Sequence, residues 1–441
     1  MNSSIAPESL REAQPDRLAP GERVLERLLR GFPGSAAFRI GTGSTHVVGN
    51  FPPDFTIVIR DPSVLRMLAF KGSLLTVAEA YFRGLVEIEG DLYAALRLKG
   101  HFQRIALRIP ERLAMLRDLL MLPRRQETPL AVDGSPQIAT SRTFRHRHSR
   151  PSDREAISFH YDASNRFYGI FLDQEMLYSC AYFEDPSWTI DQAQRAKLDH
   201  ICRKLRLSAG ERFLDVGCGW GGLVCWAAAR YGVRAHGITI SQMQFDCARE
   251  RVARSGLQDR VTVERRDYRD LPGNATYDKV ASIGMFEHVG LANLGVYNET
   301  VRRVLRPGGL FLNHGVTRDD EGWKKTTETQ FINRYIFPDA EVDTVSNVLQ
   351  GMERAGFEIH DVESLRMHYA LTLRHWVRRL EAAQAQAVAE VGEIRYRTWR
   401  LYMTACALQF EEGATSIHQI LASNRAGGAA PVPLTRRDLY F

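Results

Sequence analysis

The sequence has few cysteines, and their spacing indicates neither a metal site nor a redox site. The six are Cys180, Cys202, Cys218, Cys225, Cys247 and Cys406, and no two of them form a C-x-x-C pair. Zinc cages and redox dithiols are usually built on such pairs. We therefore expect no bound metal, and a reducing cytoplasm as the compartment.

Long apolar runs are also missing from the 441 residues. No stretch approaches the ~20 consecutive apolar residues of a membrane span. The first residues lack the charged start and apolar core of a signal peptide, and no internal repeat is visible. At 44% apolar residues the chain can still bury a sizeable core. Its length predicts two domains.

The sequence carries an excess of positive charge, with a net charge of +6. Such a charge favours nucleic acid, an anionic membrane surface or an acidic ligand as partner. Residues 123–154 hold seven arginines against Glu127, Asp133 and Asp153, which leaves +4 of that total. This stretch is either a solvated linker or a segment attracted to anionic lipid headgroups. Phe144 is its only aromatic residue, so nucleic acid, which is bound by aromatic stacking, is not expected as a partner.

Ahead of this linker, the sequence predicts a disordered N-terminus over 1–20 and a first domain over 21–122. Residues 55–61, FTIVIRD, alternate like a strand, and residues 84–98, GLVEIEGDLYAALRL, resemble a strand that enters a helix. Residues 104–125 are basic and amphipathic, so they either lie on a membrane or cover a core as a helix. No catalytic arrangement of side chains is visible in this domain.

The most informative stretch is residues 211–222, ERFLDVGCGWGG. A short apolar run ends in the closely spaced glycines Gly217, Gly219 and Gly221, and a helix-like segment follows at once. This layout of strand, glycine turn and helix opens a nucleotide-binding α/β sheet. Asp215 stands two residues before the first glycine. An acid there disfavours a diphosphate, which prefers a bare helix N-terminus, and suits a cation such as the α-amino group of S-adenosylmethionine.

In the second domain, predicted over 155–441, strands and helices alternate. Further strands are expected at 234–240, 261–267, 277–285 and 308–317, with 357–365 and 416–423 closing the sheet. The pattern predicts an α/β fold with a doubly wound, Rossmann-like, parallel-rich sheet, beside a smaller α+β N-terminal domain. A ligand should then bind at the carboxyl ends of the strands, near the switch in strand order.

Polar residues near the predicted strand ends are candidates for ligand contacts. Thr239 ends the second strand and Gln244 follows on the next helix, and both suit a ribose or a methionine moiety. The alternative is that Ser241 caps the helix and Thr239 is an ordinary strand residue. Tyr268 and Arg269 follow the third strand, where Tyr268 suits stacking on an adenine.

Glu287 and His314 are the candidates for catalysis. Glu287 follows the fourth strand in GMFEHVG, where a carboxylate facing an apolar pocket is unfavourable unless it is paired. His314 in the fifth strand is, taken alone, an ordinary core histidine, but with Glu287 on the neighbouring strand end it indicates a polar pocket. Cys180 is a candidate nucleophile for which the sequence places no base.

Six segments together resemble the cyclopropane fatty acid synthase family: HYDASNRFY, YSCAYF, LDVGCGWGG, GITIS, GMFEHVG and FINRYIFP. Members of this family resemble class I S-adenosylmethionine-dependent methyltransferases that act on unsaturated lipid chains. The resemblance covers about residues 160–411, and YSCAYF with GMFEHVG is its most specific part. The N-terminal domain resembles, more loosely, the lipid-binding domain of the longer members that act on phospholipids.

The resemblance implies a role for each matching residue. It implies contacts with S-adenosylmethionine by Tyr178, Ser179, Asp215, Gly217, Gly219, Gly221, Thr239, Gln244, Tyr268 and Arg269. It implies a bicarbonate ion held by Cys180, Glu287, His314, Tyr369 and the backbone of Val316. Cys406 joins the catalytic set beside the substrate channel. The family's usual His-Thr-Ile is here His314-Gly315-Val316, a departure expected to loosen the strand end.

The implied reaction adds a methylene from S-adenosylmethionine to the double bond of an unsaturated acyl chain of a phospholipid and forms a cyclopropane ring. Aromatic faces such as Tyr168, Phe183 and Tyr369 would stabilise the carbocation, and bicarbonate would remove the proton. Two alternatives stay open: a methyl-branched product, and a non-catalytic lipid-binding protein. A lipid substrate also implies peripheral contact with an anionic membrane at its inner, cytoplasmic face, and a homodimer is left open.

Overall fold

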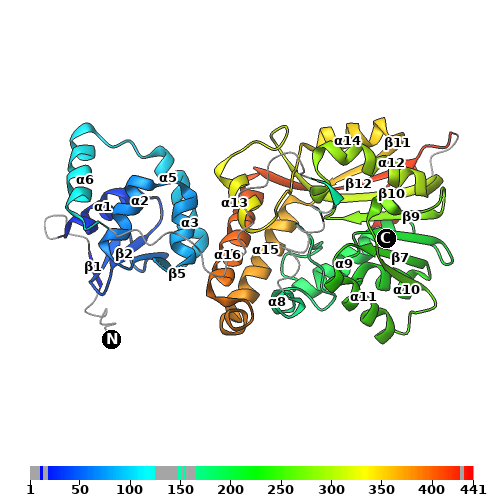
Figure 1. Cartoon of the computed structure of the whole chain (residues 1–441), viewed down its shortest axis with the longest axis horizontal. Coiled ribbons are helices and arrows are strands. Elements are labelled where there is room, and N and C mark those ends of the chain that lie inside the picture. The colour runs from blue at the N-terminus through cyan, green and yellow to red at the C-terminus, as the bar shows by residue number, and fades with distance from the viewer. Residues whose placement is uncertain are drawn as a thin grey trace. The chain divides into compact units, whose positions relative to one another are not determined.

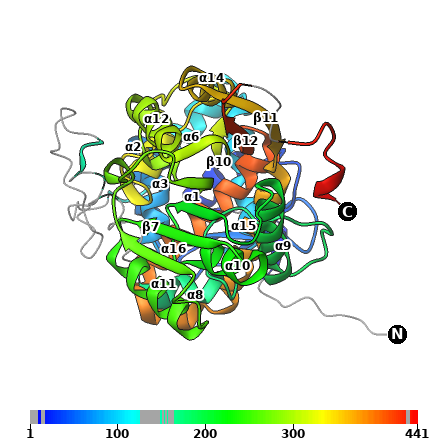
Figure 2. The same cartoon turned by 90° about the vertical axis from the view of Figure 1, so that its right-hand side faces the viewer.

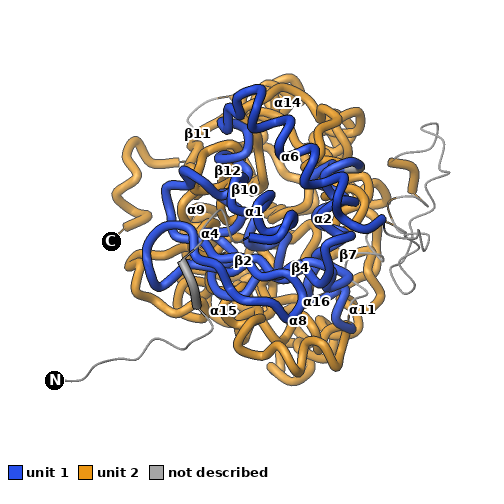
Figure 3. The backbone as a smooth tube through the Cα atoms, turned by 90° about the vertical axis from the view of Figure 1, so that its left-hand side faces the viewer, with its two compact units in different colours: residues 1–135, 392–405 blue, residues 136–391, 406–441 orange. Residues whose placement is uncertain are grey.

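The computed structural model, shown in Figure 1, describes residues 10–12, 18–124, 148–150, 153, 156, 164–427 and 432–440. The chain divides into two compact units, residues 1–135 with 392–405 and residues 136–391 with 406–441 (Figure 3). Residues 392–405, which fall within the predicted second domain, thus group with the first unit. Most of the predicted linker lies outside the described residues, so its role stays a prediction.

The first unit is built around a mixed sheet of five strands. In spatial order these are β1 (Leu10–Glu12), β3 (Thr45–Val48), β2 (Ala36–Ile40), β4 (Phe55–Ile59) and β5 (Val86–Gly90). Its helices are α1 (Pro20–Leu29), α2 (Pro62–Lys71), α3 (Leu74–Phe82), α4 (Leu92–Leu96), α5 (Leu98–Arg104) and α6 (Ile109–Met121).

The local predictions for this unit are confirmed where the structure describes them. The strand expected in 55–61 is β4, and the strand and helix expected in 84–98 are β5 and α4. Asp91 caps α4 by accepting a hydrogen bond from the backbone N–H of Tyr93, as an aspartate before an apolar run commonly does. Within the segment 1–20, for which we expected disorder, residues 10–12 instead pair in parallel with β3.

The second unit contains a sheet of seven strands (Figure 1). In spatial order these are β11 (Phe357–Ser364), β12 (Thr415–Asn424), β10 (Leu305–Arg318), β9 (Tyr277–Ile283), β6 (Arg212–Val216), β7 (Arg234–Thr239) and β8 (Val261–Arg265). The five from β10 to β8 are mutually parallel, and β12 runs antiparallel between β10 and β11. This confirms the predicted parallel-rich sheet and its two closing strands.

Helices cover both faces of this sheet, which makes it doubly wound (Figure 2). Successive strand residues point to opposite faces, so Phe213 packs into one core and its neighbour Leu214 into the other. Helices α9, α10 and α11 contribute to the first core, and α12 and α14 to the second. The helices of this unit are α8 (Asn165–Phe171), α9 (Ile190–Lys204), α10 (Gly222–Tyr231), α11 (Gln242–Arg254), α12 (Leu294–Val304), α13 (Thr327–Tyr335), α14 (Val345–Arg354), α15 (Arg366–Ala382) and α16 (Gln384–Glu412), the last of which also enters the first unit.

The strand order reverses at β6, because β6 pairs with β7 on one side and with β9 on the other. The chain leaves β6 toward one edge of the sheet and returns through β9 toward the opposite edge. Loops after β6 and β9 therefore diverge and leave a crevice at their carboxyl ends. Among the described residues, no helix combines the length and the apolar composition needed to cross a bilayer.

Candidate active site

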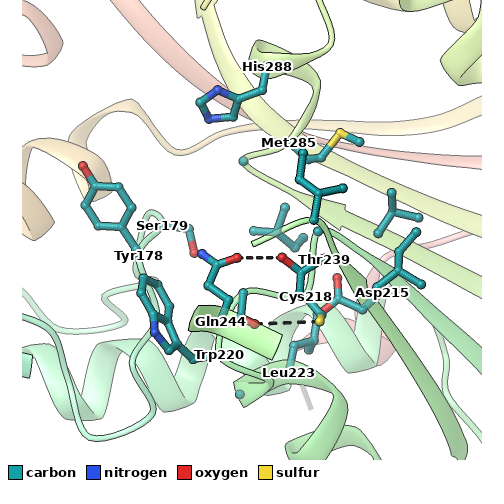
Figure 4. Close-up of a pocket in the computed structure, with 18 of the residues that line it drawn as sticks. Tyr178, Ser179, Asp215, Cys218, Trp220, Leu223, Thr239, Gln244, Met285 and His288 are labelled. Atoms are coloured by element: carbon teal, nitrogen blue, oxygen red, sulfur yellow. Dashed lines mark hydrogen bonds between the residues drawn. The ribbon is translucent and has the colours of Figure 1, made fainter. Parts of the chain in front are cut away.

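A pocket lies at the carboxyl ends of β6, β7 and β9 and beside the turn after β8, where the strand order predicts a ligand crevice. Figure 4 shows Tyr178 and Trp220 along one wall, Asp215 and Leu223 on another, and the pair Thr239 and Gln244 between them. Nine of the ten residues predicted to contact the cofactor line this pocket: Tyr178, Ser179, Asp215, Gly217, Gly219, Thr239, Gln244, Tyr268 and Arg269.

The glycine turn brings the backbone to the edge of the pocket. Gly219 has a φ of +54°, and a Cβ placed on it would meet no protein atom within 4 Å, so the space beside it belongs to the pocket. Gly221, the tenth predicted residue, does not line the pocket. Its φ is +81°, and a Cβ there would lie 3.0 Å from the Cβ of Ala248 on α11. Gly221 therefore starts α10 and allows the two helices to approach closely.

Asp215 is a buried carboxyl group with unused hydrogen-bonding capacity. Asp215 is the penultimate residue of β6, and its Oδ1 has no hydrogen-bond partner among the described residues. Burial raises the pKa of Asp215 to about 7, and the nearby Lys197 ammonium opposes that shift. A buried acid of this kind is unfavourable on its own and would gain a partner from a cation in the pocket.

Lys197 is a pocket residue that the sequence analysis missed. It lies on α9, is 1% exposed, and donates a hydrogen bond of 2.8 Å to Oγ of Ser179, its one such partner in the described part of the chain. Burial lowers the pKa of Lys197 to about 8, although Asp173, Cys180 and Asp215 nearby raise it. The available signal was its place on the apolar face of α9, in helical register with Ala193 and Ile201.

Thr239 and Gln244 form a hydrogen-bonded pair at the floor of the pocket. The hydroxyl of Thr239 donates to Oε1 of Gln244 over 2.8 Å (Figure 4). Ser241 also caps α11 by accepting from the backbone N–H of Gln244. Ser241 is therefore the helix cap, while Thr239 and Gln244 line the pocket, and their contact with a ligand stays a prediction.

Tyr268 and Arg269 form the wall beyond β8. The guanidinium of Arg269 lies 5.4 Å from the ring centre of Tyr268 and is fixed by ion pairs of 2.6 Å with Asp267 and 2.8 Å with Asp153. Tyr268 packs edge-on against Tyr297 at 5.6 Å. The carboxylates hold Arg269 in place, so it is a positioned part of the wall rather than a free cation.

The side chains of Glu287 and His314 form the second polar group of the site. Glu287 lies in the 3-10 turn Phe286–His288, four residues beyond the end of β9, rather than at the strand end itself. Its Oε1 accepts a hydrogen bond of 2.7 Å from the backbone N–H of Val316 on β10, whereas its Oε2 is buried with no partner among the described residues. Burial raises the pKa of Glu287 to about 7.

His314 lies two residues before Val316 on β10 and is fully buried. Burial, followed by the charges of Lys197 and Lys204, holds the pKa of His314 well below its usual value, so its ring is neutral. The amide of Gln419 donates to Nδ1 over 3.2 Å, which leaves the ring proton on Nε2. This Nε2 has no hydrogen-bond partner among the described residues. A buried donor and a buried carboxyl oxygen thus both lack partners near the same strand end.

Tyr369 lies near three of the other predicted catalytic residues, Cys180, Cys406 and Glu287. Burial raises the pKa of its hydroxyl well above the usual value, and the neighbouring groups that add to the shift are Tyr178, Cys180, Cys406 and Glu287. Burial likewise raises the pKa of the Cys180 thiol, which donates weakly to the backbone oxygen of Ala181. Cys180 is therefore a neutral thiol, unsuited to nucleophilic attack.

Of the three aromatic residues expected to face a carbocation, two lie near Tyr178. Tyr178 is among the groups that raise the pKa of Tyr369, and the ring of Tyr168 lies 5.5 Å from that of Tyr178. Phe183 instead stacks on His375 at 5.5 Å. The structure also adds Trp220, Met285 and His288 to the pocket wall, none of which the sequence analysis selected.

Gly315 does not loosen the strand as expected. It is paired with His418 of β12, and a Cβ at this position would lie 2.1 Å from the ring of Phe286. The missing side chain lets Phe286, next to Glu287, pack directly on β10. The departure from His-Thr-Ile thus accommodates an aromatic ring beside the second polar group.

Comparisons with known proteins agree with this geometry. Residues 148–420 match the family model described as mycolic acid cyclopropane synthetase. A probable fatty acid methyltransferase of Pseudomonas putida is 42% identical over 391 residues, which cover 88% of this chain and 92% of that protein. The cyclopropane-fatty-acyl-phospholipid synthase of Escherichia coli K12 is 40% identical over 266 residues, which cover 60% of this chain and 66% of that protein.

The similarity extends to solved structures. The crystal structure of mycolic acid cyclopropane synthase CmaA1 complexed with SAH and CTAB has a TM-score of 0.57 to this chain at 32% identity, covering 61% of this chain and 98% of that one. The same family is indicated by the sheet order, by the pocket where the strand order reverses and by the sequence similarity. The chain belongs to the mycolic acid cyclopropane synthetase family of S-adenosylmethionine-dependent lipid methyltransferases.

Proposed function

We propose that this protein adds a methylene from S-adenosylmethionine to the double bond of an unsaturated acyl chain of a phospholipid and so forms a cyclopropane ring. The observation that supports this most is that two buried polar atoms, Oε2 of Glu287 and Nε2 of His314, have no hydrogen-bond partner among the described residues. Attack of the double bond on the methyl group leaves a carbocation, and closing the ring without an added reductant requires removal of a proton from the new methyl group. Two such atoms suit a small oxyanion that serves as the base.

The residues around the first pocket suit the charges of the cofactor, which supplies a methyl group on a sulfonium. Asp215 would accept hydrogen bonds from its α-ammonium. Lys197 and Ser179 would donate to its α-carboxylate, because both line the pocket and the Lys197 ammonium has donors to spare. Opposite charges on the two sides of the methionine moiety would fix its direction, and thereby the direction in which the methyl group points.

Affinity for S-adenosylmethionine should fall as the pH falls below about 7, the pKa of Asp215. Because this pKa is raised, the empty site holds the carboxyl protonated at lower pH, and only the ionised form attracts an ammonium. One proton must then leave on binding, so the dissociation constant should rise about tenfold per pH unit below 7. Calorimetry between pH 5 and pH 8 measures this slope. Asp215→Asn should bind S-adenosylmethionine weakly, and its dissociation constant should not depend on pH in this range. If the variant keeps the pH dependence, a group other than Asp215 causes it.

Lys197→Met is expected to weaken binding of S-adenosylmethionine by roughly 10–100-fold, the value of one charge-assisted hydrogen bond in a buried site. Decarboxylated S-adenosylmethionine, which lacks the recognised group, should bind wild type and variant alike. Lys204→Met is a matched control, since Lys204 is as buried on the same helix but pairs with Glu363 at 2.5 Å. Equal losses for both ligands would make Lys197 a structural residue.

The second polar group would serve the proton transfer. Bicarbonate, when bound, would supply a small base for the proton. Glu287 and His314 would hold it by hydrogen bonds, with Tyr369 and Cys180 completing the set. The backbone N–H of Val316, which was also expected to hold the ion, donates to Oε1 of Glu287 instead and so would act through that carboxyl group. The aromatic rings of Tyr168 and Tyr369 would face positive charge on the acyl chain. The apolar surroundings of these residues would exclude water, which otherwise traps such a charge.

The alternative product is a methyl-branched acyl chain, favoured by the 42% identity to a probable fatty acid methyltransferase. Incubation with labelled S-adenosylmethionine and mixed unsaturated phospholipids, followed by mass and proton resonance analysis, separates the two. A cyclopropane gains one carbon and loses its double bond without added reductant, and it shows upfield ring protons. A chain that gains the carbon but keeps a double bond, or needs a reductant, would support methylation instead. No labelled lipid at all would leave a non-catalytic, lipid-binding protein.

A substrate of this kind resides in a bilayer, so we also propose peripheral contact with an anionic membrane at its cytoplasmic face. The surplus of four positive charges in residues 123–154 supports this.

A further inference from the structure

Helix α6 of the first unit exposes an apolar stripe. Among the described residues, fifteen large apolar side chains are exposed, of which ten belong to the first unit and five to α6 alone. Ile109, Leu113, Leu116 and Leu120 are between 44% and 74% exposed. Their spacing of four, three and four residues places them on one side of the helix. Such a continuous exposed stripe marks an interaction surface.

The opposite side of α6 holds the helix firmly to its unit. Asp118 is fully buried and forms ion pairs of 2.6 Å with both Arg23 and Arg27 of α1. Leu119 packs into the core of the unit, as does the partly buried Met115. The orientation of α6 is therefore fixed, and its outward stripe is a stable feature of the surface. Both expectations for residues 104–125 bear on this helix, since one side covers a core and the other remains open.

Positive charges border the stripe. On a projection of about 100° per residue, Arg112 falls on one edge of the stripe and Arg117 on the other, and both are exposed. The two acids of the helix, Glu111 and Asp118, lie on the opposite side. An apolar stripe between arginines, with no acid beside it, is typical of a helix that lies in the plane of an anionic lipid surface.

The apolar surface continues beyond the end of α6. The guanidinium of Arg66 on α2 donates to the backbone oxygens of Leu120 and Leu122, over 2.8 Å and 2.5 Å. It also lies 5.9 Å from the ring centre of Phe70, which is 55% exposed. Arg66 thus ties an exposed aromatic ring to the C-terminal end of the stripe. Phenylalanine is typical of the apolar side of helices that lie at the surface of a lipid bilayer.

We propose that α6 is the element by which this protein docks on an anionic lipid surface, with the stripe in the acyl region and Arg112 and Arg117 at the headgroups. This inference rests on the proposed function in that the substrate resides in a bilayer. Pairing with α6 of a second copy is disfavoured, because it would bring exposed arginines at the edges of the two stripes close together.

Co-sedimentation with vesicles of unsaturated phosphatidylglycerol or phosphatidylcholine tests the proposal. Leu113→Gln with Leu116→Gln should lower the partition coefficient for phosphatidylglycerol vesicles about tenfold or more, because two leucines no longer enter lipid. Glutamine keeps the helix. Val296→Gln with Met367→Gln, two exposed apolar residues of the second unit, should leave the partition coefficient unchanged. Equal binding by the α6 variant and wild type would overturn the proposal.

Two further measurements separate the alternatives. Arg112→Gln with Arg117→Gln should remove the preference for anionic over neutral vesicles, and a retained preference would refute the role of these arginines. If light scattering shows that the leucine variant dissociates a dimer while its vesicle binding is unchanged, the stripe is a contact between copies and the proposal fails. Turnover on detergent-dispersed lipid should be equal in wild type and leucine variant. Absence of turnover in both would refute the proposed function, whereas vesicle binding, measured without cofactor, tests α6 separately.

Discussion

Replacing Glu287 by glutamine is expected to lower turnover by roughly 10²–10⁴ while affinity for S-adenosylmethionine stays unchanged. Glutamine retains an oxygen that can accept from the backbone N–H of Val316, as the carboxyl group does. It removes the carboxyl oxygen that has no partner and is proposed to orient the base. Single-turnover measurements on unsaturated phospholipid, with calorimetry of cofactor binding, give the two quantities. Carefully decarbonated wild-type enzyme should in addition gain activity when bicarbonate is restored.

Thermal stability separates this catalytic role from a merely structural one. Because burial raises the pKa of Glu287 to about 7, its ionisation above that pH destabilises the folded protein. Glu287→Gln should therefore melt at the same or a higher temperature than wild type at pH 8, although it is nearly inactive. Glu353→Gln, an exposed carboxylate on α14, is the control and should change neither quantity. A Glu287→Gln protein with wild-type turnover and a lower melting temperature would show that the residue only braces β10.

Replacing Gly219 by valine is expected to weaken binding of S-adenosylmethionine by more than about a hundredfold, or about 2.7 kcal/mol. The backbone at Gly219 has a φ of +54°, and the added side chain would project into the pocket because no protein atom occupies the space around its Cβ. Gly219→Val should lose both turnover and cofactor binding, whereas Glu287→Gln should lose turnover but keep cofactor binding. Calorimetry with S-adenosylmethionine and with S-adenosylhomocysteine measures the change.

Gly256→Val is the matched control for this prediction. Gly256 follows α11 with a φ of +64°, and a Cβ on it also meets no atom within 4 Å, but it does not line the pocket. Both substitutions place a β-branched residue in a left-handed conformation, so both should lower the melting temperature to a similar extent. Only Gly219→Val should lose the ligand. Equal affinities of the two variants would mean that the cofactor does not approach the glycine turn.

The fold of the second unit could be predicted because short stretches of its sequence each indicate a strand or a helix. The apolar runs that became β6, β7, β9 and β10 alternate with amphipathic helices, and that alternation specifies a doubly wound sheet. The pocket then follows from topology, since ligands bind where the strand order reverses. Asp215, Thr239 and Gln244 could be selected because strand ends and glycines can be located in the sequence. Gly221 could not be separated from Gly219, since only the proximity of α11 gives it a packing role.

What the sequence by itself determined is the fold of the second unit, the position of the pocket at the strand ends and the family. Only the tertiary structure decided which polar groups are buried without partners, because that depends on segments far apart in the chain. Lys197 donates to Ser179, which belongs to another segment of the chain. Assembly of β9, β10 and β12 buries Oε2 of Glu287 and Nε2 of His314, and neither atom has a partner among the described residues. The same holds for α6. Its amphipathic pattern allowed either side to face inward, and the ion pairs of Asp118 with α1 direct the leucines to the outside. Pairing the buried carboxylate outweighs burying the four apolar side chains of the stripe, since an unpaired charge in a core costs far more free energy than exposed apolar surface.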